Sequence, residues 1–195
     1  NTLAILLNPD IFNTLSMPGF LEVIRKSPPW LRDSFSAPNN VRNPAKIVAL
    51  DVAGLKNGNE GVTDEKETSA TDGDVIWSFD LMGEADVFPH NLAASSPLVV
   101  DGILYATTGN GVDEGHVNIP SPLAPSFVAI DQKTGKLVWE SAEPGSKIIH
   151  GNWSNAAYGV VKGKPQVVFG GGDGWCYAFD AKPENPGEEG KLKTV

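Results

Sequence analysis

The sequence predicts an all-β protein made of repeated, four-stranded antiparallel sheets, and three observations support this prediction. Short runs of β-branched and aromatic residues alternate in polarity from one residue to the next, as strands with one buried face do. Turn-forming residues separate the runs, with 21 Gly and 15 Pro among 195 residues. The same strand-and-turn strings recur along the chain, which indicates an internal repeat.

The best-defined element is a hairpin predicted over residues 127–139. An alternating run from Phe127 to Asp131 forms its first strand, and an apolar run that ends at Trp139 forms its second. Gly135 lies in the turn between them, where a positive φ suits glycine. An isolated hairpin is only marginally stable in water, so we expect this one to belong to a larger sheet.

Partial copies of this hairpin occur on both sides of it. Residues 47–51 and 175–180 end as its first strand does, and residues 73–77 begin as its second strand does. A further hairpin precedes the strand in two places, over residues 95–111 and 155–174. One repeat is therefore four strands in roughly 50 to 60 residues, which is typical of β-propeller blades.

These repeats predict a partial β-propeller of four-stranded antiparallel blades, about two to three in number, with an irregular N-terminal arm. The predicted parts are an arm at 1–45 and blades at 46–195, namely a half blade at 46–80, a full blade at 95–141 and an incomplete blade at 155–195. A propeller closes with about four to eight blades. We therefore expect either a fragment of a longer propeller or a chain whose open faces are covered by other chains.

One string also resembles a known family motif. The residues Ala129, Asp131, Gly135, Lys136 and Trp139 stand at the spacing of the tryptophan-docking motif of quinoprotein-type β-propellers. That family holds the pyrroloquinoline-quinone (PQQ) dehydrogenases and non-catalytic relatives, such as the lipoprotein that helps assemble outer-membrane proteins. The resemblance covers about residues 46–195, with partial motif copies at 49–77 and 178–191. Residues 75–195 resemble, more specifically, PQQ-like propeller proteins of unassigned function from planctomycete-type bacteria.

The resemblance implies a structural role for two tryptophans and a location for the chain. Trp139 and Trp77 are expected to pack between blades, against the small residues of neighbouring repeats, and so to hold the blades in register. The location that the family implies is periplasmic or otherwise extracytoplasmic.

Composition excludes some classes of partner. A net charge of −9 argues against nucleic acid, whose recognition needs a basic surface, and against electrostatic docking on anionic lipid. No apolar run is long enough for a transmembrane helix. The single cysteine, Cys176, cannot form an internal disulfide and is expected to be a small buried residue within a strand.

Residues 1–45 do not follow the repeat. A strand is expected at 3–7 and a short helix at 20–26, which the following Pro28 stops. The arm either packs on the flank of the propeller itself or docks on a partner subunit through its apolar side chains. The candidate partner-binding residues are Leu3, Ile5, Leu6, Ile11, Phe12, Phe20 and Trp30.

All three histidines are expected at one end of the blades. His90 and His150 stand at the same phase of the repeat, in the loops that enter the first strand of a blade, and His116 lies in the insertion 112–125 at the same end. Two interpretations remain open: the histidines fix these loops by hydrogen bonds, or they bind a metal or cofactor. The candidate residues are His90, His150 and Asn152 for a cofactor, and Asp113, Glu114 and His116 for a metal.

The expected function is non-catalytic. Many alcohol-oxidising quinoprotein dehydrogenases use a vicinal Cys-Cys pair and an Asp base, but this chain has one Cys and none of its Asp residues can be assigned to the base. We expect a cofactor-free scaffold or interaction subunit that docks on other protein chains of a larger assembly, which can be associated with a membrane. The alternative is a cofactor-binding segment of a PQQ-dependent dehydrogenase, with PQQ and Ca²⁺.

Overall fold

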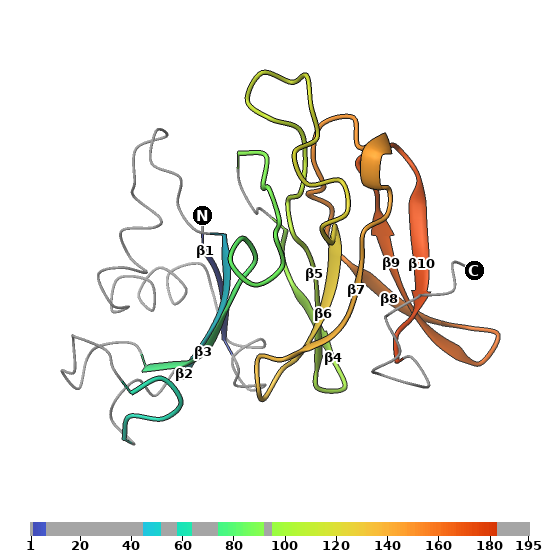
Figure 1. The fold of residues 1–195 in the computed structure, drawn as a ribbon. Helices are drawn as coiled ribbons and strands as arrows, with labels where there is room; N and C mark the ends of the chain where they lie inside the picture. Colours follow the sequence, from blue (N-terminus) through green and yellow to red (C-terminus); the bar gives the residue numbers. More distant parts are fainter. Residues whose placement is uncertain (1, 7–44, 52–57, 64–73, 92–94, 183–195) are drawn as a thin grey trace, which may run out of the picture. The chain divides into compact units, whose positions relative to one another are not determined.

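The computed structural model describes residues 2–6, 45–51, 58–63, 74–91 and 95–182. These residues contain ten β-strands, one short 3-10 helix (Gly145–Lys147) and no α-helix, so the all-β prediction is confirmed for the described part of the chain (Figure 1). In that part, no helix has the length and apolarity that a membrane span requires. The expected helix at 20–26 lies outside the described residues.

The chain divides into two compact units, at residues 1–79 and 80–195. The first unit holds a three-stranded sheet in the order β1 (Thr2–Leu6), β2 (Lys46–Asp51) and β3 (Asp74–Asp80). Strands β2 and β3 are those of the predicted half blade. Strand β1, expected at 3–7, pairs parallel to β2 with Thr2 opposite Lys46, whereas neighbouring strands of a propeller blade run antiparallel.

The second unit begins with the predicted full blade. Strands β4 (Leu98–Val100), β5 (Ile103–Thr107), β6 (Phe127–Asp131) and β7 (Leu137–Ser141) form one sheet in chain order. Every neighbouring pair in it is antiparallel. This is the up-and-down sheet that the sequence predicts for residues 95–141.

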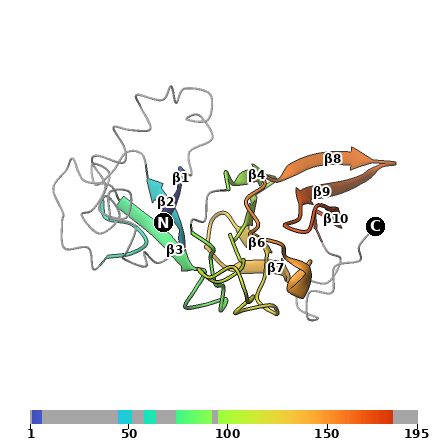
Figure 2. The ribbon, with the colours of Figure 1, turned by 90° about the horizontal axis from the view of Figure 1, so that it is seen from above.

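The second sheet of this unit matches the predicted incomplete blade. It contains β8 (Ala157–Val161), β9 (Lys164–Gly170) and β10 (Cys176–Asp180), again antiparallel and in chain order. The two sheets lie side by side (Figures 1 and 2). Within the described residues the sheets are blade-like, but they do not close into a ring.

The turn between β6 and β7 has the geometry that the sequence predicts. Gly135 has a φ of 71°, which glycine adopts without strain. The Asp131 Oδ1 atom accepts hydrogen bonds from the Thr134 N–H and hydroxyl, both at 2.8 Å, and from the Lys133 N–H at 3.1 Å. A register shift next to Ala129 then places Trp139 opposite Ala129, on the same face of the sheet.

The core of the second unit lies between its two sheets. Trp139 is 3% exposed, and its ring centroid lies 5.5 Å from that of Phe179 and 6.4 Å from that of Phe169. Phe127 stacks on Phe169 at 4.7 Å. Aromatic pairs in these arrangements are favourable beyond the area they bury, so this cluster joins β5–β7 to β9 and β10.

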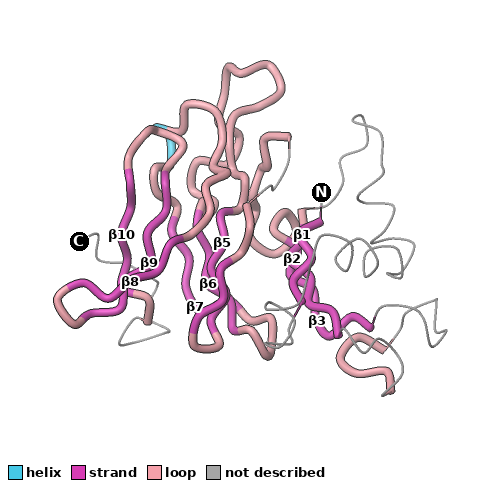
Figure 3. Tube along the Cα trace, turned by 180° about the vertical axis from the view of Figure 1, so that it is seen from behind, coloured by secondary structure: helices cyan, strands magenta, loops and turns pink. Residues whose placement is uncertain are grey.

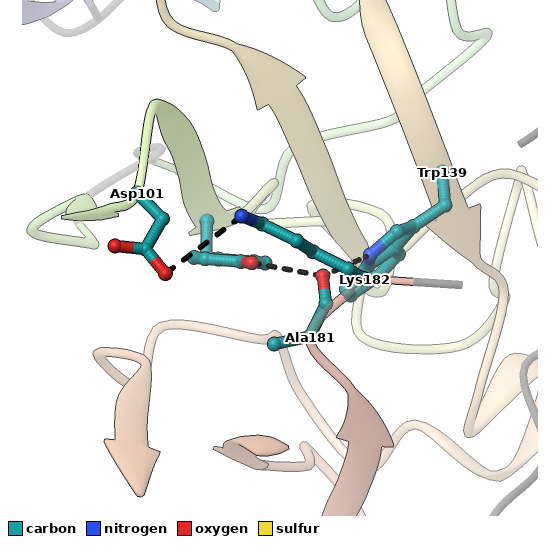
Figure 4. A network of polar contacts seen from close by, with 5 residues as sticks. Asp101, Trp139, Ala181 and Lys182 are labelled. Atoms are coloured by element: carbon teal, nitrogen blue, oxygen red, sulfur yellow. Dashed lines mark hydrogen bonds and ion pairs between the residues drawn. The ribbon is translucent and has the colours of Figure 1, made fainter. Parts of the chain in front are cut away.

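Polar contacts at the edge of this core involve the residue that follows β10. The Ala181 carbonyl accepts a 2.8 Å hydrogen bond from the Tyr105 hydroxyl and a longer one, 3.5 Å, from Trp139 Nε1. Lys182 pairs with Asp101 at 3.7 Å in the same network (Figure 4). Burial, with smaller effects of Tyr158 and Asp101, raises the pKa of Tyr105 to about 12, so its hydroxyl remains a donor at neutral pH.

The expectation that Cys176 is buried is wrong. Cys176 is the first residue of β10 and is exposed. The next residue, Tyr177, packs against the core between the sheets. Because side chains alternate along a strand, Cys176 points to the other face of the β8–β10 sheet, away from the β4–β7 sheet.

Candidate functional site

Two features of the second unit are candidates for function, and the first is the outer face of the β8–β10 sheet. Ala178 lies opposite Val168, which lies opposite Ala157, so the three share one face. Val168 and Ala178 are half-buried, and Ala157 is exposed. Trp175, just before β10, is 71% exposed.

In the repeat, the outer face of the β8–β10 sheet corresponds to a face of the β4–β7 sheet that is buried. In the aligned strings of β6 and β10, Ala129 corresponds to Ala178 and Phe127 to Cys176. Ala129 and Phe127 are fully buried because they face the β8–β10 sheet. The outer face of β8–β10 is thus the counterpart of the face on which the β4–β7 sheet packs against its neighbour.

The residues of the docking motif lie in different surroundings. Ala129 and Trp139 are buried in the core between the sheets; Asp131 and Gly135 form the β6–β7 turn; Lys136 is exposed. Trp77, in β3 of the first unit, is 7% exposed. The sequence predicts small residues of neighbouring repeats as the neighbours of Trp139, and its neighbours in the structure include the aromatic rings of Phe169 and Phe179.

The second feature is a cluster of all three histidines. Their loops lie at the end of the sheets opposite the β6–β7 turn (Figures 1 and 3). His90 precedes β4, His116 lies in the connection between β5 and β6, and His150 lies between β7 and β8. His90 is buried, whereas His116 and His150 are exposed.

Backbone pairing holds the three loops together. Gly111 and Gly151 form an antiparallel bridge, and so do Pro89 and Asn110. The Val112 N–H donates to the His150 carbonyl at 2.9 Å, and the His90 N–H donates to the Gly109 carbonyl at 2.9 Å. The histidines therefore stand on loops that are tied to each other.

The ring nitrogens of the cluster converge on one another. His150 Nε2 lies 2.8 Å from His90 Nε2 and 2.9 Å from His116 Nε2. His90 Nδ1 lies 2.9 Å from the Val112 carbonyl, and His116 Nδ1 lies 3.1 Å from the Glu114 carbonyl. Desolvation, followed by the neighbouring His90 and His116, lowers the pKa of His150, which favours its neutral form.

The acidic candidates of the same loop are not part of this cluster. The Asp113 carboxylate accepts hydrogen bonds from the Val117 N–H at 2.9 Å and from Asn118 Nδ2 at 2.8 Å. These bonds, the first being the larger cause, lower the pKa of Asp113. Glu114 is exposed, and its backbone carbonyl, not its carboxylate, contacts His116. Asp113 therefore shapes the loop that carries His116.

Asn152 is buried, and its side chain forms hydrogen bonds to other residues of the protein. Its Nδ2 donates to the Asn110 carbonyl at 2.9 Å and to Ser126 Oγ at 3.1 Å, and its Oδ1 accepts the Gly172 N–H at 2.7 Å. An amide has two N–H donors and one carbonyl acceptor, so these bonds occupy both N–H groups and one oxygen position. Asn152 braces the loops beneath the histidines.

Sequence interpretation missed the residues that bring the histidine loops so close. A Cβ on Gly111 would lie 2.7 Å from the His90 Cβ and would also collide with the His150 carbonyl, and a Cβ on Gly151 would lie 2.7 Å from the Trp153 ring. Only glycine fits at such distances. For Gly151 the sequence held a signal, because it directly follows His150, whereas Gly111 stands five residues before His116 and gave none. The Val112 and Glu114 carbonyls gave no signal, since loop conformation alone directs them.

The Ca²⁺ ion that the family resemblance implies does not fit these residues. Ca²⁺ takes six to eight oxygen ligands, whereas the cluster offers three imidazole nitrogens. The nearby Asp113 and Asn152 side chains already form the hydrogen bonds given above. Among the described residues, His90, His116 and His150 form the one group of three or more potential ligands.

The candidate partner-binding residues of the arm are not described. Leu3, Ile5 and Leu6 lie in β1, whose side chains are not placed, and Ile11, Phe12, Phe20 and Trp30 lie outside the described residues. Docking through the arm stays a prediction.

No family model matches the sequence, and no curated protein is significantly similar to it.

Proposed function

We propose that the chain is a non-catalytic interaction subunit, a scaffold whose blade-like sheets dock on other chains of a larger assembly. One observation supports this most: the outer face of the β8–β10 sheet, with Ala157, Val168 and Ala178 half-buried or exposed, corresponds to a face that is buried in the β4–β7 sheet. An uncovered apolar face of this kind marks an interaction surface.

The repeat also indicates what kind of partner fits. The buried face of the β4–β7 sheet is covered by aromatic side chains of the next sheet, above all Phe169 and Phe179. Small side chains such as Ala157 and Ala178 leave room for bulky ones. We infer a partner that presents a β-sheet with aromatic residues on one face. An extracytoplasmic location, at the periphery of a membrane complex or free of one, rests on the family resemblance alone.

The single cysteine makes the proposal testable without a new mutation. Cys176 is exposed on this face, so a photoreactive maleimide attached there should crosslink the full chain to its partner in gently purified assemblies. The matched control moves the probe to a loop, in the double variant Cys176→Ala, Leu123→Cys; Leu123 is 89% exposed. We expect partner adducts from Cys176 and none from position 123. A native mass near the 20.7 kDa of the chain, with no adduct, would refute the proposal.

A pair of charge substitutions separates docking from folding. Ala178→Lys puts a charge on the proposed docking face and should release the partner. Val160→Lys, at a position that is 61% exposed on the opposite face of the same sheet, should leave the assembly intact. Loss of the assembly in both variants would show that the outer face is not specific.

A further inference from the structure

The histidine cluster contains more acceptors than its protons can satisfy. A carbonyl oxygen only accepts, so the contacts of His90 Nδ1 with Val112 O and of His116 Nδ1 with Glu114 O require both Nδ1 atoms to carry the proton. In the neutral rings, Nε2 of His90 and of His116 then carries no proton and offers a lone pair. Both lone pairs face the same atom, His150 Nε2, at 2.8 and 2.9 Å.

One proton on His150 Nε2 cannot fully serve both neighbours. A neutral imidazole has one N–H, and a hydrogen bond needs that N–H directed at its acceptor. If His150 Nε2 carries the proton, at least one of the two contacts has no well-directed hydrogen bond; if it does not, both contacts join two lone pairs, which repel each other. A cation at the centre of the three nitrogens removes this conflict, because each lone pair then becomes a ligand.

From this geometry we propose that His90, His116 and His150 bind a divalent transition-metal ion, zinc being the best fit, with a fourth position open to water or an exchangeable anion. This site is independent of the proposed docking function. All three nitrogens lie within 4.8 Å of one another. Tetrahedral zinc with nitrogen ligands at about 2.0–2.1 Å holds them about 3.3 Å apart, so small side-chain adjustments suffice.

The surroundings are those of a metal site. A metal-binding histidine usually donates its other ring N–H to a carbonyl or carboxylate, which fixes the ring and its tautomer. His90 and His116 do this with backbone carbonyls. The Trp153 ring packs against His150 at 5.1 Å and against His90 at 5.9 Å, and it forms an apolar wall beside the nitrogens. Imidazole suits zinc, copper and nickel, and a set without thiolate or carboxylate disfavours calcium and magnesium.

The number of histidine ligands and their exposure indicate that the fourth coordination position of the metal is open. Structural zinc sites have four protein ligands, whereas sites with three keep a position for water or a reactant. Among the described residues no fourth Asp, Glu, Cys or His joins the group. His90 forms the buried base, and the exposed His116 and His150 form the outer side, so the open position faces solvent.

The test is metal binding by the full chain, with Cys176→Ala as the background to remove the single thiol. Calorimetry with Zn²⁺ should show one ion per chain. Co²⁺ as a probe should give the visible absorption of tetrahedral coordination, and added azide should shift it by taking the open position. His116→Ala and His150→Ala remove exposed ligands and should weaken Zn²⁺ binding by more than about 100-fold, above the effect of losing an outer-shell partner.

The control variant is Glu140→Gln, which changes an exposed carboxylate on β7 outside the cluster and should leave the affinity unchanged. Circular dichroism checks that each variant is folded. Zn²⁺ affinity that is the same in His116→Ala and His150→Ala as in the background protein would overturn the proposal. A Co²⁺ spectrum that azide does not change would overturn the open fourth position.

Discussion

At the scale of single residues, two backbone carbonyls determine what the histidines can do. Val112 O and Glu114 O each hold an Nδ1 proton and so direct an Nε2 lone pair into the cluster. A histidine free in solution exchanges between its tautomers. The loops remove that freedom before any ligand is present.

The first prediction concerns these tautomers. In metal-free protein, the neutral rings of His90 and His116 should both carry the proton on Nδ1. Two-bond proton–nitrogen correlation spectra of ¹⁵N-histidine-labelled protein distinguish the two tautomers. His116→Ala assigns one set of signals by its loss. An Nε2-protonated His90 would contradict the hydrogen bond to Val112.

The second prediction concerns the tryptophan between the sheets. Trp139→Ala should lower the free energy of unfolding by about 3–5 kcal/mol, the range for a buried Trp or Phe cut to Ala, because Trp139 is 3% exposed. Trp175→Ala is the matched control, since Trp175 is 71% exposed and should change stability by less than about 0.5 kcal/mol. Urea unfolding followed by circular dichroism measures both. Equal losses would show that Trp139 does not join the sheets.

At the scale of elements, the β6–β7 turn depends on one carboxylate. The Thr134 hydroxyl, as the largest cause, and the Thr134 and Lys133 N–H groups hold the pKa of Asp131 below its ordinary value of 3.8. A carboxyl whose folded pKa is lowered stabilises the fold above its unfolded pKa, and this contribution disappears as the pH falls through the folded pKa. The turn should therefore be strongest at neutral pH.

The third prediction follows from this sign. Thr134→Ala should raise the pKa of Asp131 towards 3.8, measured by carboxyl ¹³C titration. At pH 7 it should lower the free energy of unfolding by about 0.5–1 kcal/mol, as expected for one exposed hydrogen bond. Below pH 3 the difference between variant and native protein should shrink. A difference that stays constant with pH would mean that the hydroxyl does not act through Asp131.

The strands of the second unit could be predicted from sequence, whereas its loops could not. Alternation and turn residues located β6 and β7 around Gly135 because these are local signals. The contacts of the 112–125 insertion depend on distant partners: Asn110 Nδ2 donates to the Ser121 carbonyl, and Val112 pairs with His150. The repeat phase indicated that the histidines share one end of the sheets, but only the folded loops set their distances.

At the scale of the whole molecule, the same repeat position is buried in one sheet and open in the next. Phe127 is fully buried, and its counterpart Cys176 is exposed. Residue type predicted Cys176 to be buried, which would be correct for a sheet followed by another sheet. The wrong prediction for Cys176 therefore concerns the surroundings of β10, whose outer face is not packed against a further sheet among the described residues of this unit, and not the strand itself. The proposed partner would restore burial at this position.

The fourth prediction is that zinc stabilises the second unit by holding its three histidine loops together. The three ligands lie before β4, between β5 and β6, and between β7 and β8, so one ion would tie together loops from both sheets. A ligand that binds only the folded state at 100 times its Kd adds about 2.7 kcal/mol. That corresponds to a rise in Tm of roughly 5 to 10 °C.

Thermal unfolding with Zn²⁺ and with a chelator measures this difference. His150→Ala should unfold at the same temperature in both conditions, which separates binding at the cluster from general effects of the ion. The site also predicts where protection appears: amide hydrogen exchange should slow in residues 88–91, 110–118 and 148–153, and should stay unchanged in the β6–β7 turn at the far end. Equal slowing at both ends would mean that the ion acts on global stability alone. Slowing confined to the histidine end would show that the three loops close around it while the sheets, already joined by Trp139, remain as they are.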